Sequence, residues 1–332
     1  MSEQSILNIG DDKLKAVSKD FFFNGMLLPV NVYLKIKSNH YLLIGKKGEK
    51  SEFAQLHSFK NEKSEVCVMF EDLSTLMSYI TQLTGKLIEQ KNVPDSVKVK
   101  FLAGLTESAL ADFDGKNFTS QFQLQQTSKF LLSMKDSLQD FDQIMLLLSE
   151  IPEEESKHAI FTCLIALSIC DEMQSTTKAA REKVALGCLL HDVGYRHLPS
   201  DLLKKPKHQW TFEENALFES HPQKAVEMLR DIKDISNDVL LIIMEHHENA
   251  QGTGFPKKIR DIKISPLGRI VGLANYFAEL LFNHSGSSGK TYTADEAIKY
   301  IEDILGQPFN RQAFLALKNI INKNYLQEKS KS

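Results

Sequence analysis

Cysteine is scarce in this sequence, and its spacing excludes two classes of protein. The four cysteines stand at positions 67, 163, 170 and 188, and no two of them form a CxxC pair. A disulfide-stapled secreted domain and a cysteine-rich zinc module both need closer and repeated spacing. Cys163, Cys170 and Cys188 fall within apolar helical stretches, so we expect them to be buried, reduced thiols.

Long hydrophobic runs, a basic leader and a strong net charge are missing as well. The longest apolar run near the expected site, residues 239–244, has six residues, whereas a membrane-spanning helix needs about 20 apolar residues. The first residues do not combine basic side chains with an apolar stretch, as a secretory signal does. The net charge of -3 excludes a general binder of nucleic acid or of acidic membranes. We therefore expect a soluble cytoplasmic protein without a DNA or membrane partner.

The patterning of apolar residues changes along the chain and indicates two domains. A single core rarely grows beyond roughly 250–300 residues, and this chain has 332. Residues 29–37 and 65–70 alternate apolar and polar side chains, as half-buried strands do, and residues 41–44 are expected to form a return strand. Residues 73–89 then take helical spacing. The sequence predicts a small α+β domain over residues 1–120, with a sensory or regulatory role.

Helical patterning dominates from residue 97 to the end of the chain. The clearest break lies at residues 112–119, which contain Asp114-Gly115, and we place the domain boundary there. Residues 121–328 are expected to form an all-α domain. The predicted fold class is therefore mainly α, with a small α+β domain at the N-terminus.

Histidines recur in order beside successive helical patterns in the second half of the chain. They are His158, the pair His191-Asp192, His221, and the adjacent His246-His247. His221-Pro222 opens a helix for which Ser220 is the expected N-cap. Any one histidine taken alone is more often a core or surface residue than a metal ligand. Separate segments that each carry such a residue favour a shared metal site.

The two histidine pairs fall at helix ends. The helical pattern of residues 181–192 ends at His191-Asp192, and the pattern of residues 236–248 carries His246-His247 at its end. Adjacent helical positions differ by about 100° in direction. Both members of a pair can therefore reach one site only if that site lies beside the last turn.

The types of ligand narrow the choice of metal and reaction. Imidazole and carboxylate without thiolate suit iron, manganese or zinc. A carboxylate such as Asp192 can bridge two cations, which a neutral imidazole cannot do. Two cations roughly 3.5–4 Å apart stabilise both the attacking and the leaving oxygen of an in-line phosphoryl displacement. The pattern therefore predicts a two-metal phosphohydrolase.

Taken together, the motifs of this half resemble those of the HD-GYP family, bacterial phosphodiesterases of cyclic di-GMP within the HD superfamily. The resemblance covers residues 150–307, and its motifs are His191-Asp192-Val193-Gly194, Leu198-Pro199 through Lys205-Pro206 to Thr211-Phe212-Glu213-Glu214, His221-Pro222, His246-His247-Glu248, Gly252-Thr253-Gly254-Phe255-Pro256 and Arg269-Ile270-Val271. It implies an all-α HD-type helical bundle around two divalent metal ions, with iron expected ahead of manganese and zinc.

The resemblance also implies how the ligands divide between the two ions. One ion would be held by His158, His191, Asp192 and Asn275. The other would be held by the bridging Asp192 together with His221, His246 and His247. Glu154, one helical turn before His158, would be an additional ligand where a third ion is bound. Its alternative role is that of a solvated acid in the run Glu153-Glu154-Glu155.

Substitutions relative to the family pattern affect one metal ligand and the substrate contacts. Asn275 stands where the family has an aspartate; its side-chain oxygen can coordinate but brings no negative charge, so that ion should bind more weakly. Tyr195 replaces the lysine of the HD-x-G-K motif, and Phe255 replaces the signature tyrosine. Residues 283–290 replace an arginine-rich segment and leave Lys290 as the phosphate contact.

The resemblance implies hydrolysis of cyclic di-GMP, with His191 and Asp192 as catalytic residues. The substrate contacts would be Tyr195, Phe255, Lys290 and Arg269. Arg269 has a structural ion pair as its alternative role. A second function of another class is a degenerate domain that binds the dinucleotide or a partner protein with little turnover, and a third is hydrolysis of another phosphoester. The Gly254-Phe255-Pro256 loop would also contact GGDEF-domain proteins.

Overall fold

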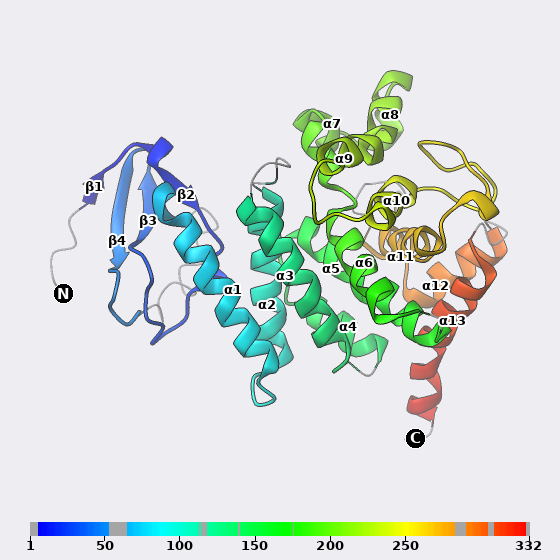
Figure 1. Ribbon diagram of the computed structural model, residues 1–332, viewed down its shortest axis with the longest axis horizontal. Helices are drawn as coiled ribbons and strands as arrows, with labels where there is room; N and C mark the ends of the chain where they lie inside the picture. Colours follow the sequence, from blue (N-terminus) through cyan, green and yellow to red (C-terminus); the bar gives the residue numbers. More distant parts are fainter. Residues whose placement is uncertain are drawn as a thin grey trace. The chain divides into compact units, whose positions relative to one another are not determined.

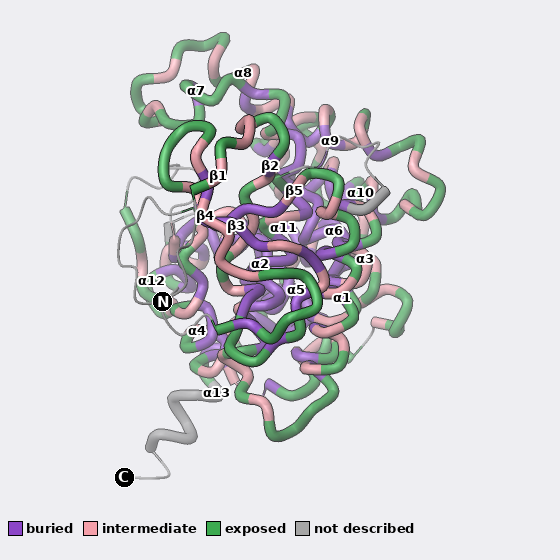
Figure 2. Tube along the Cα trace, turned by 90° about the vertical axis from the view of Figure 1, so that its left-hand side faces the viewer, coloured by how far each residue is buried: buried purple, intermediate pink, exposed green. Residues whose placement is uncertain are grey.

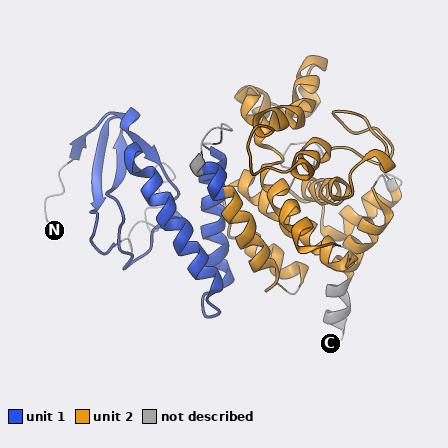
Figure 3. Cartoon of the chain, in the orientation of Figure 1, with its two compact units in different colours: residues 1–112, 118–123 blue, residues 113–117, 124–332 orange. Residues whose placement is uncertain are grey.

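Strands precede helices in the computed structural model, as the sequence patterns predict (Figure 1). The structure describes residues 6–52, 65–111, 113, 118–138, 140–174, 176–282, 290–304 and 309–329. The chain divides into two compact units, residues 1–112 with 118–123, and residues 113–117 with 124–332 (Figure 3). The domain limits expected at 1–120 and 121–328 and the regulatory role of the first domain stay predictions.

The described part of the first unit contains one antiparallel sheet. Its strands are β1 (Ile6–Asn8), β2 (Leu14–Ala16), β3 (Val32–Lys37), β4 (His40–Gly45) and β5 (Val66–Met69). They lie in the order β1-β4-β3-β5-β2, and all neighbours are antiparallel. The strands expected within residues 29–37, 41–44 and 65–70 are β3, β4 and β5. The sequence does not indicate β1 and β2, because three residues each are too few to show alternation.

A small hydrophobic cluster lies on this sheet. It consists of Leu14, Tyr33, Tyr41 and Cys67, with Leu7, Ile9, Leu43 and Met69 packed against it. Burial raises the pKa of the Cys67 thiol to about 11, so the thiol stays protonated at neutral pH. The Tyr41 hydroxyl donates a hydrogen bond of 2.6 Å to Asp11 Oδ1.

Long helices follow the sheet in sequence. They are α1 (Leu73–Glu89), α2 (Asp95–Ala111) and α3 (Phe118–Lys135). The bounds of α1 are those of the helical pattern seen in the sequence. Its buried residues include Leu76, Ile80, Thr84 and Ile88, which recur every four positions along one helix face. This one-sided burial is why periodicity alone locates the helix.

The described part of the second unit is helical. Its elements are α4 (Phe141–Leu148), α5 (Glu154–Met173), α6 (Lys178–Leu190), η5 (Val193–His197), α7 (Ser200–Lys204), η6 (Lys207–Gln209), α8 (Phe212–Glu219), α9 (His221–Leu229), α10 (Asn237–Glu245), η7 (Asp261–Lys263), α11 (Pro266–Phe282), α12 (Ala294–Lys299), η8 (Tyr300–Ile304) and α13 (Arg311–Lys329). The mainly α fold class is thus confirmed. Among the described residues, no helix combines the length and the apolar content that crossing a membrane requires.

Helix α5 is the central element of this unit. It packs against α6, α11 and α13, and every residue from 158 to 170 is buried (purple in Figure 2). A helix that is covered on all sides shows no amphipathic stripe, and Cys163 and Cys170 are buried in it, as expected. The burial of α5 also brings His158, near its N-terminal end, into the interior.

The ends of three helices set the positions of the predicted site residues. Helices α6 and α10 end one residue before His191 and His246, so both pairs lie beside a last turn, as predicted. Helix α9 begins at His221. Ser220 occupies the N-cap position of α9, as expected, but its side chain does not cap the helix, because its hydroxyl donates to Leu217 O at 2.6 Å. Ser220 keeps helical backbone angles (φ −84°, ψ −11°) after α8, so its side chain does not reach forward to the next helix.

Candidate metal centre

Three histidine rings of the second unit are held in the same way. The Nδ1 atom of each faces the backbone carbonyl three residues earlier: His191 faces Cys188 O at 2.7 Å, His221 faces Phe218 O at 2.8 Å, and His246 faces Ile243 O at 2.6 Å. A carbonyl oxygen can only accept, so Nδ1 carries the proton in all three rings. Nε2 of a neutral ring then presents a lone pair to the centre of the site.

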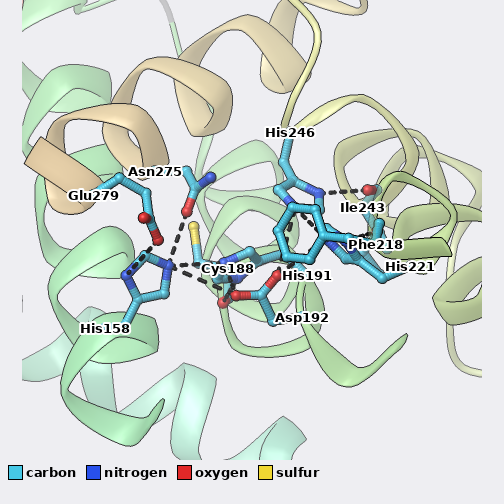
Figure 4. A network of polar contacts seen from close by, with 10 residues as sticks. All are labelled: His158, Cys188, His191, Asp192, Phe218, His221, Ile243, His246, Asn275 and Glu279. Atoms are coloured by element: carbon cyan, nitrogen blue, oxygen red, sulfur yellow. Dashed lines mark hydrogen bonds and ion pairs between the residues drawn. The ribbon is translucent and has the colours of Figure 1, made fainter. Parts of the chain in front are cut away.

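These Nε2 atoms converge on the carboxylate of Asp192 (Figure 4). Its Oδ2 atom lies 3.1 Å from His191 Nε2 and 3.8 Å from His158 Nε2. Its Oδ1 atom lies 3.3 Å from His221 Nε2 and 3.6 Å from His246 Nε2. Each carboxylate oxygen therefore faces a different pair of imidazoles, which is the geometry of a bridging ligand.

His158 and Asn275 complete one side of the site. His158 comes from α5 and Asn275 from α11. Nε2 of His158 lies 3.1 Å from Nε2 of His191 and 2.8 Å from Oδ1 of Asn275. Both His158 and Asn275 are only 2% exposed. The structure thus places Asn275, a predicted metal ligand, next to His158, another predicted ligand.

His247 and Phe255 lie on the other side. Their rings stack with centroids 4.3 Å apart and planes 26° apart. The loop that carries Phe255 is held by Glu248, whose carboxylate accepts hydrogen bonds from the backbone N–H groups of Lys257 (2.6 Å) and Ile259 (3.1 Å). The glutamate of the His-His-Glu motif thus anchors the loop that bears the aromatic ring.

The electrostatics of the cluster suit metal ligands. Burial lowers the pKa of His246 to about 4 and the pKa of His247 well below its usual value, so both rings are neutral. Burial acts to raise the pKa of Asp192, but the neighbouring rings of His191, His221 and His246 together outweigh it and hold that pKa well below its usual value. Burial likewise acts to lower the pKa of His191, but the Asp192 carboxylate acts in the opposite direction, and that pKa is raised. The carboxylate thus attracts a positive charge, which a proton or a metal ion can supply.

The residues present fit two cations that share Asp192. Two sets of side chains have ligand atoms close enough for one ion: His158, His191 and Asp192, and Asp192, His221, His246 and His247. Nε2 atoms of His221 and His246 lie 3.2 Å apart, and their lone pairs repel unless a cation or a proton separates them. Within the described part of the chain, Asp192 Oδ1 and His247 Nε2 are buried without a hydrogen-bond partner. The assignment of each residue as a ligand stays a prediction.

A cavity of about 340 Å³ adjoins this cluster. Its walls include His246, His247, Phe255, Asn275 and Lys207. Tyr195 instead lines a separate cavity of about 410 Å³, and its ring packs 4.4 Å from the ring of His221. Tyr195, which replaces the lysine of the HD-x-G-K motif, therefore contacts a histidine of the cluster but does not line the cavity of about 340 Å³.

Other predicted residues lie apart from the cluster or are engaged elsewhere. Glu154 is exposed and pairs with Lys157 at 3.0 Å. Arg269 Nε donates to Ile264 O at 3.0 Å and lies 3.6 Å from Asp261, which is the structural alternative expected for it. Lys290 Nζ lies 4.3 Å above the ring of Tyr292, and residues 283–289 of the same loop lie outside the described residues. Substrate or metal roles for these side chains stay predictions.

Two residues of the site are missed by the sequence patterns. Glu279, on α11, is 6% exposed and its Oε1 atom lies 4.0 Å from His158 Nδ1. Lys207 lines the first cavity, and its Nζ lies 4.0 Å from the centre of the Phe218 ring. The only sequence signal for Glu279 is its position four residues after Asn275, because a helix brings such residues onto one face. Nothing in the sequence pattern singles out Lys207.

Comparisons with known proteins agree with this geometry. Residues 142–312 match the family described as HD domain. A cyclic di-GMP phosphodiesterase of Pseudomonas aeruginosa is 29% identical over 159 residues, 48% of this chain and 37% of the relative. Another, of Thermotoga maritima, is 27% identical over 218 residues, 63% of this chain and 57% of the relative. The chain thus spans between 37% and 57% of the length of these relatives.

A solved structure shares the fold. The HDG"Y"P protein from Bdellovibrio bacteriovorus superposes with a TM-score of 0.68 at 19% sequence identity, covering 93% of this chain and 99% of that one. At this identity the likeness concerns the fold alone. The family match, in contrast, extends over more than half of the residues. The chain belongs to the HD domain family, and these similarities bear out its resemblance to the HD-GYP branch.

Proposed function

We propose that this protein is a metal-dependent phosphodiesterase that hydrolyses cyclic di-GMP at a binuclear centre, with iron as the expected metal and manganese or zinc as alternatives. The observation that carries the proposal is the position of the Asp192 carboxylate between two pairs of imidazole Nε2 atoms. The substrate class is supported by the relatives from Pseudomonas aeruginosa and Thermotoga maritima, which are named cyclic di-GMP phosphodiesterases.

In this proposal the chain preorganises the ligands. Backbone carbonyls fix the rings of His191, His221 and His246 before any cation binds, so little reorganisation accompanies binding. Asp192 spans the two positions with one oxygen on each side. Two divalent cations, when bound, polarise the phosphate and stabilise charge on the attacking and leaving oxygens.

Lys207 is proposed to contact a substrate phosphate. The family lysine is replaced by Tyr195, which does not line the first cavity, whereas Lys207 does. Burial lowers the pKa of Lys207, while the carboxylates of Glu279 and Asp192 act in the opposite direction. A cation beside these carboxylates can attract and orient an anionic phosphodiester.

A second candidate is a domain that binds the dinucleotide, or a partner protein, with little turnover. Asn275 at a metal position and Tyr195 at a substrate position favour it, because both substitutions remove a charge from the centre. Docking of the Gly254-Phe255-Pro256 loop onto a GGDEF domain belongs to this candidate. In that contact one face of the Phe255 ring would meet the partner, because the other face stacks on the ring of His247.

The two candidates are separated by measuring metal content and turnover on one anaerobic preparation. Iron, manganese and zinc are quantified per chain, and cyclic di-GMP is followed for conversion to pGpG or GMP. About two metals per chain with product, both lost in D192A, is the result expected for the phosphodiesterase. Two metals with no product supports the binding domain, and a chain that binds no metal contradicts both readings of the cluster.

A further inference from the structure

His158 differs from the other fixed histidines in what faces its Nδ1 atom. His191, His221 and His246 lie at helix ends, where the carbonyl three residues earlier is available to the ring. His158 lies inside α5 (Glu154–Met173), where the preceding carbonyls serve the hydrogen bonds of the helix itself. Its Nδ1 atom faces the Oε1 atom of Glu279 instead, at 4.0 Å.

Glu279 and Asn275 address the two nitrogens of one ring. They are separated by four positions on α11, so both side chains leave the same face of the helix. Asn275 Oδ1 lies 2.8 Å from Nε2 of His158 and Glu279 approaches Nδ1 (Figure 4). With only 6% of Glu279 exposed, its carboxylate is held away from bulk water, where an ionised group requires compensating charge.

Without Glu279 the two metal positions have a single carboxylate between them, that of Asp192. The set His158, His191 and Asp192 has one carboxylate, which it shares with the set His221, His246 and His247. Asn275 adds an oxygen but no charge. Glu279 is a second buried carboxylate on the side of His158.

We propose that Glu279 is a positioning residue for His158 in the metal-bound protein, where a cation would take the place of the proton between His158 Nε2 and Asn275 Oδ1. The ring then carries its proton on Nδ1, and the Glu279 carboxylate that faces Nδ1 holds this tautomer and keeps the Nε2 lone pair directed at the cation. Glu279 also supplies the negative charge that Asn275 lacks. A carboxylate that holds a metal-bound imidazole in this way both fixes the tautomer and raises the basicity of the ligand. This inference rests on the binuclear centre of the proposed function.

A competing role for Glu279 is that of a counter-ion for Lys207. Both side chains line the same cavity, and Glu279 is the foremost carboxylate acting on the pKa of Lys207. In that role the loss of Glu279 would act on Lys207 and not on the metal. The variant K207M therefore separates the two roles.

The test is a titration of the apo protein, residues 1–332, with manganese(II), followed by electron paramagnetic resonance and calorimetry. In E279Q we expect one of the two ions to bind about 10–100-fold more weakly, the usual cost of removing such a partner, while the other ion keeps its affinity. E279D should lose less than E279Q. Thermal unfolding of each apo protein verifies that the variants fold.

A rescue variant tests the charge argument. N275D restores a carboxylate on the Nε2 side, so N275D/E279Q should recover affinity relative to E279Q, and K207M should leave both ions unchanged. In zinc-loaded protein labelled with ¹⁵N-histidine, the Nδ1–H resonance of His158 should move in E279Q and not in K207M.

The failure of this inference is distinguishable from the failure of the proposed function. Wild-type affinity for both ions in E279Q, an equal loss in K207M, or a double variant no tighter than E279Q overturns the role of Glu279, whatever the turnover. A weakened ion in E279Q without hydrolysis of cyclic di-GMP by the wild type supports the role of Glu279 and overturns the phosphodiesterase. A wild-type chain that binds no manganese overturns both.

Discussion

Gly194 lies so close to the backbone of His221 that it has no room for a side chain. A Cβ atom on Gly194 would stand 2.0 Å from the carbonyl oxygen of His221 and 3.0 Å from the backbone nitrogen of Ala225. This contact joins η5 (Val193–His197), which follows Asp192 directly, to the first turn of α9. The glycine of the HD-x-G motif therefore sets the distance between Asp192 and His221.

The first prediction concerns this contact. G194A should destabilise the second unit by about 1–3 kcal/mol, the usual cost of inserting a methyl group into a filled space, and should weaken the ion bound by His221 and Asp192. Urea unfolding and metal titration measure the two effects. G272A is the control, because its Cβ atom would meet nothing closer than His246 O at 3.3 Å. Equal losses in G272A and G194A would show that the contact has no special role.

Metal removal should lower the stability of the second unit. A ligand that binds only the folded state adds about 2.7 kcal/mol of stability at a free concentration 100 times its dissociation constant. We therefore expect the melting temperature of the loaded protein to fall on chelation and to return when manganese is added back. D192A, which lacks the shared carboxylate, should melt at the same temperature with and without chelator. A chelator effect that persists in D192A would place the stabilising ion elsewhere.

Loss of the Lys207 cation should weaken substrate binding while the metals remain bound. K207M is expected to raise KM for cyclic di-GMP about tenfold or more, since a hydrogen bond to a charged group contributes about 1.5–3 kcal/mol. Metal content should be unchanged. K204M is the matched control, because Lys204 is exposed at the end of α7. A KM that responds equally to both substitutions would indicate a general effect of charge and not a phosphate contact.

Helix-end histidines can be predicted from sequence, whereas Glu279 and Lys207 cannot. The pairs at 191–192 and 246–247 lie where a periodic apolar pattern stops, so local spacing brings them beside a last turn. The proximity of Glu279 to His158 depends instead on how α11 packs against α5, and Lys207 reaches the cavity through η6, a three-residue element. Such contacts depend on tertiary packing. The four-residue spacing puts Glu279 on the face of α11 that carries Asn275, but it does not show what that face contacts.

The same limit applies to helix caps and short strands. Ser220 has the residue type of an N-cap, but α8 runs almost directly into α9 and leaves its backbone helical. Strands β1 and β2 are recognisable only through their partners, since β1 pairs with β4 and β2 with β5. Periodicity predicts the type of an element where one of its faces is buried, as in α1. It does not predict short strands, which depend on their pairing partners, or a cap such as Ser220, which depends on how one helix leads into the next.

The last prediction concerns the sheet of the first unit. Hydrogen bonds from the Tyr41 hydroxyl and the Asn39 backbone lower the pKa of Asp11 from 3.8 to about 2. A lowered folded-state pKa contributes stability that is complete above pH 3.8 and is lost as the pH falls towards 2. Y41F should therefore move the Asp11 titration to higher pH and begin this loss at higher pH, as NMR of ¹³C-labelled aspartate carboxyls would measure. Y33F removes a hydroxyl from the same cluster and should leave Asp11 unchanged; an equal change in both variants would mean that packing, not the hydrogen bond, sets this pKa.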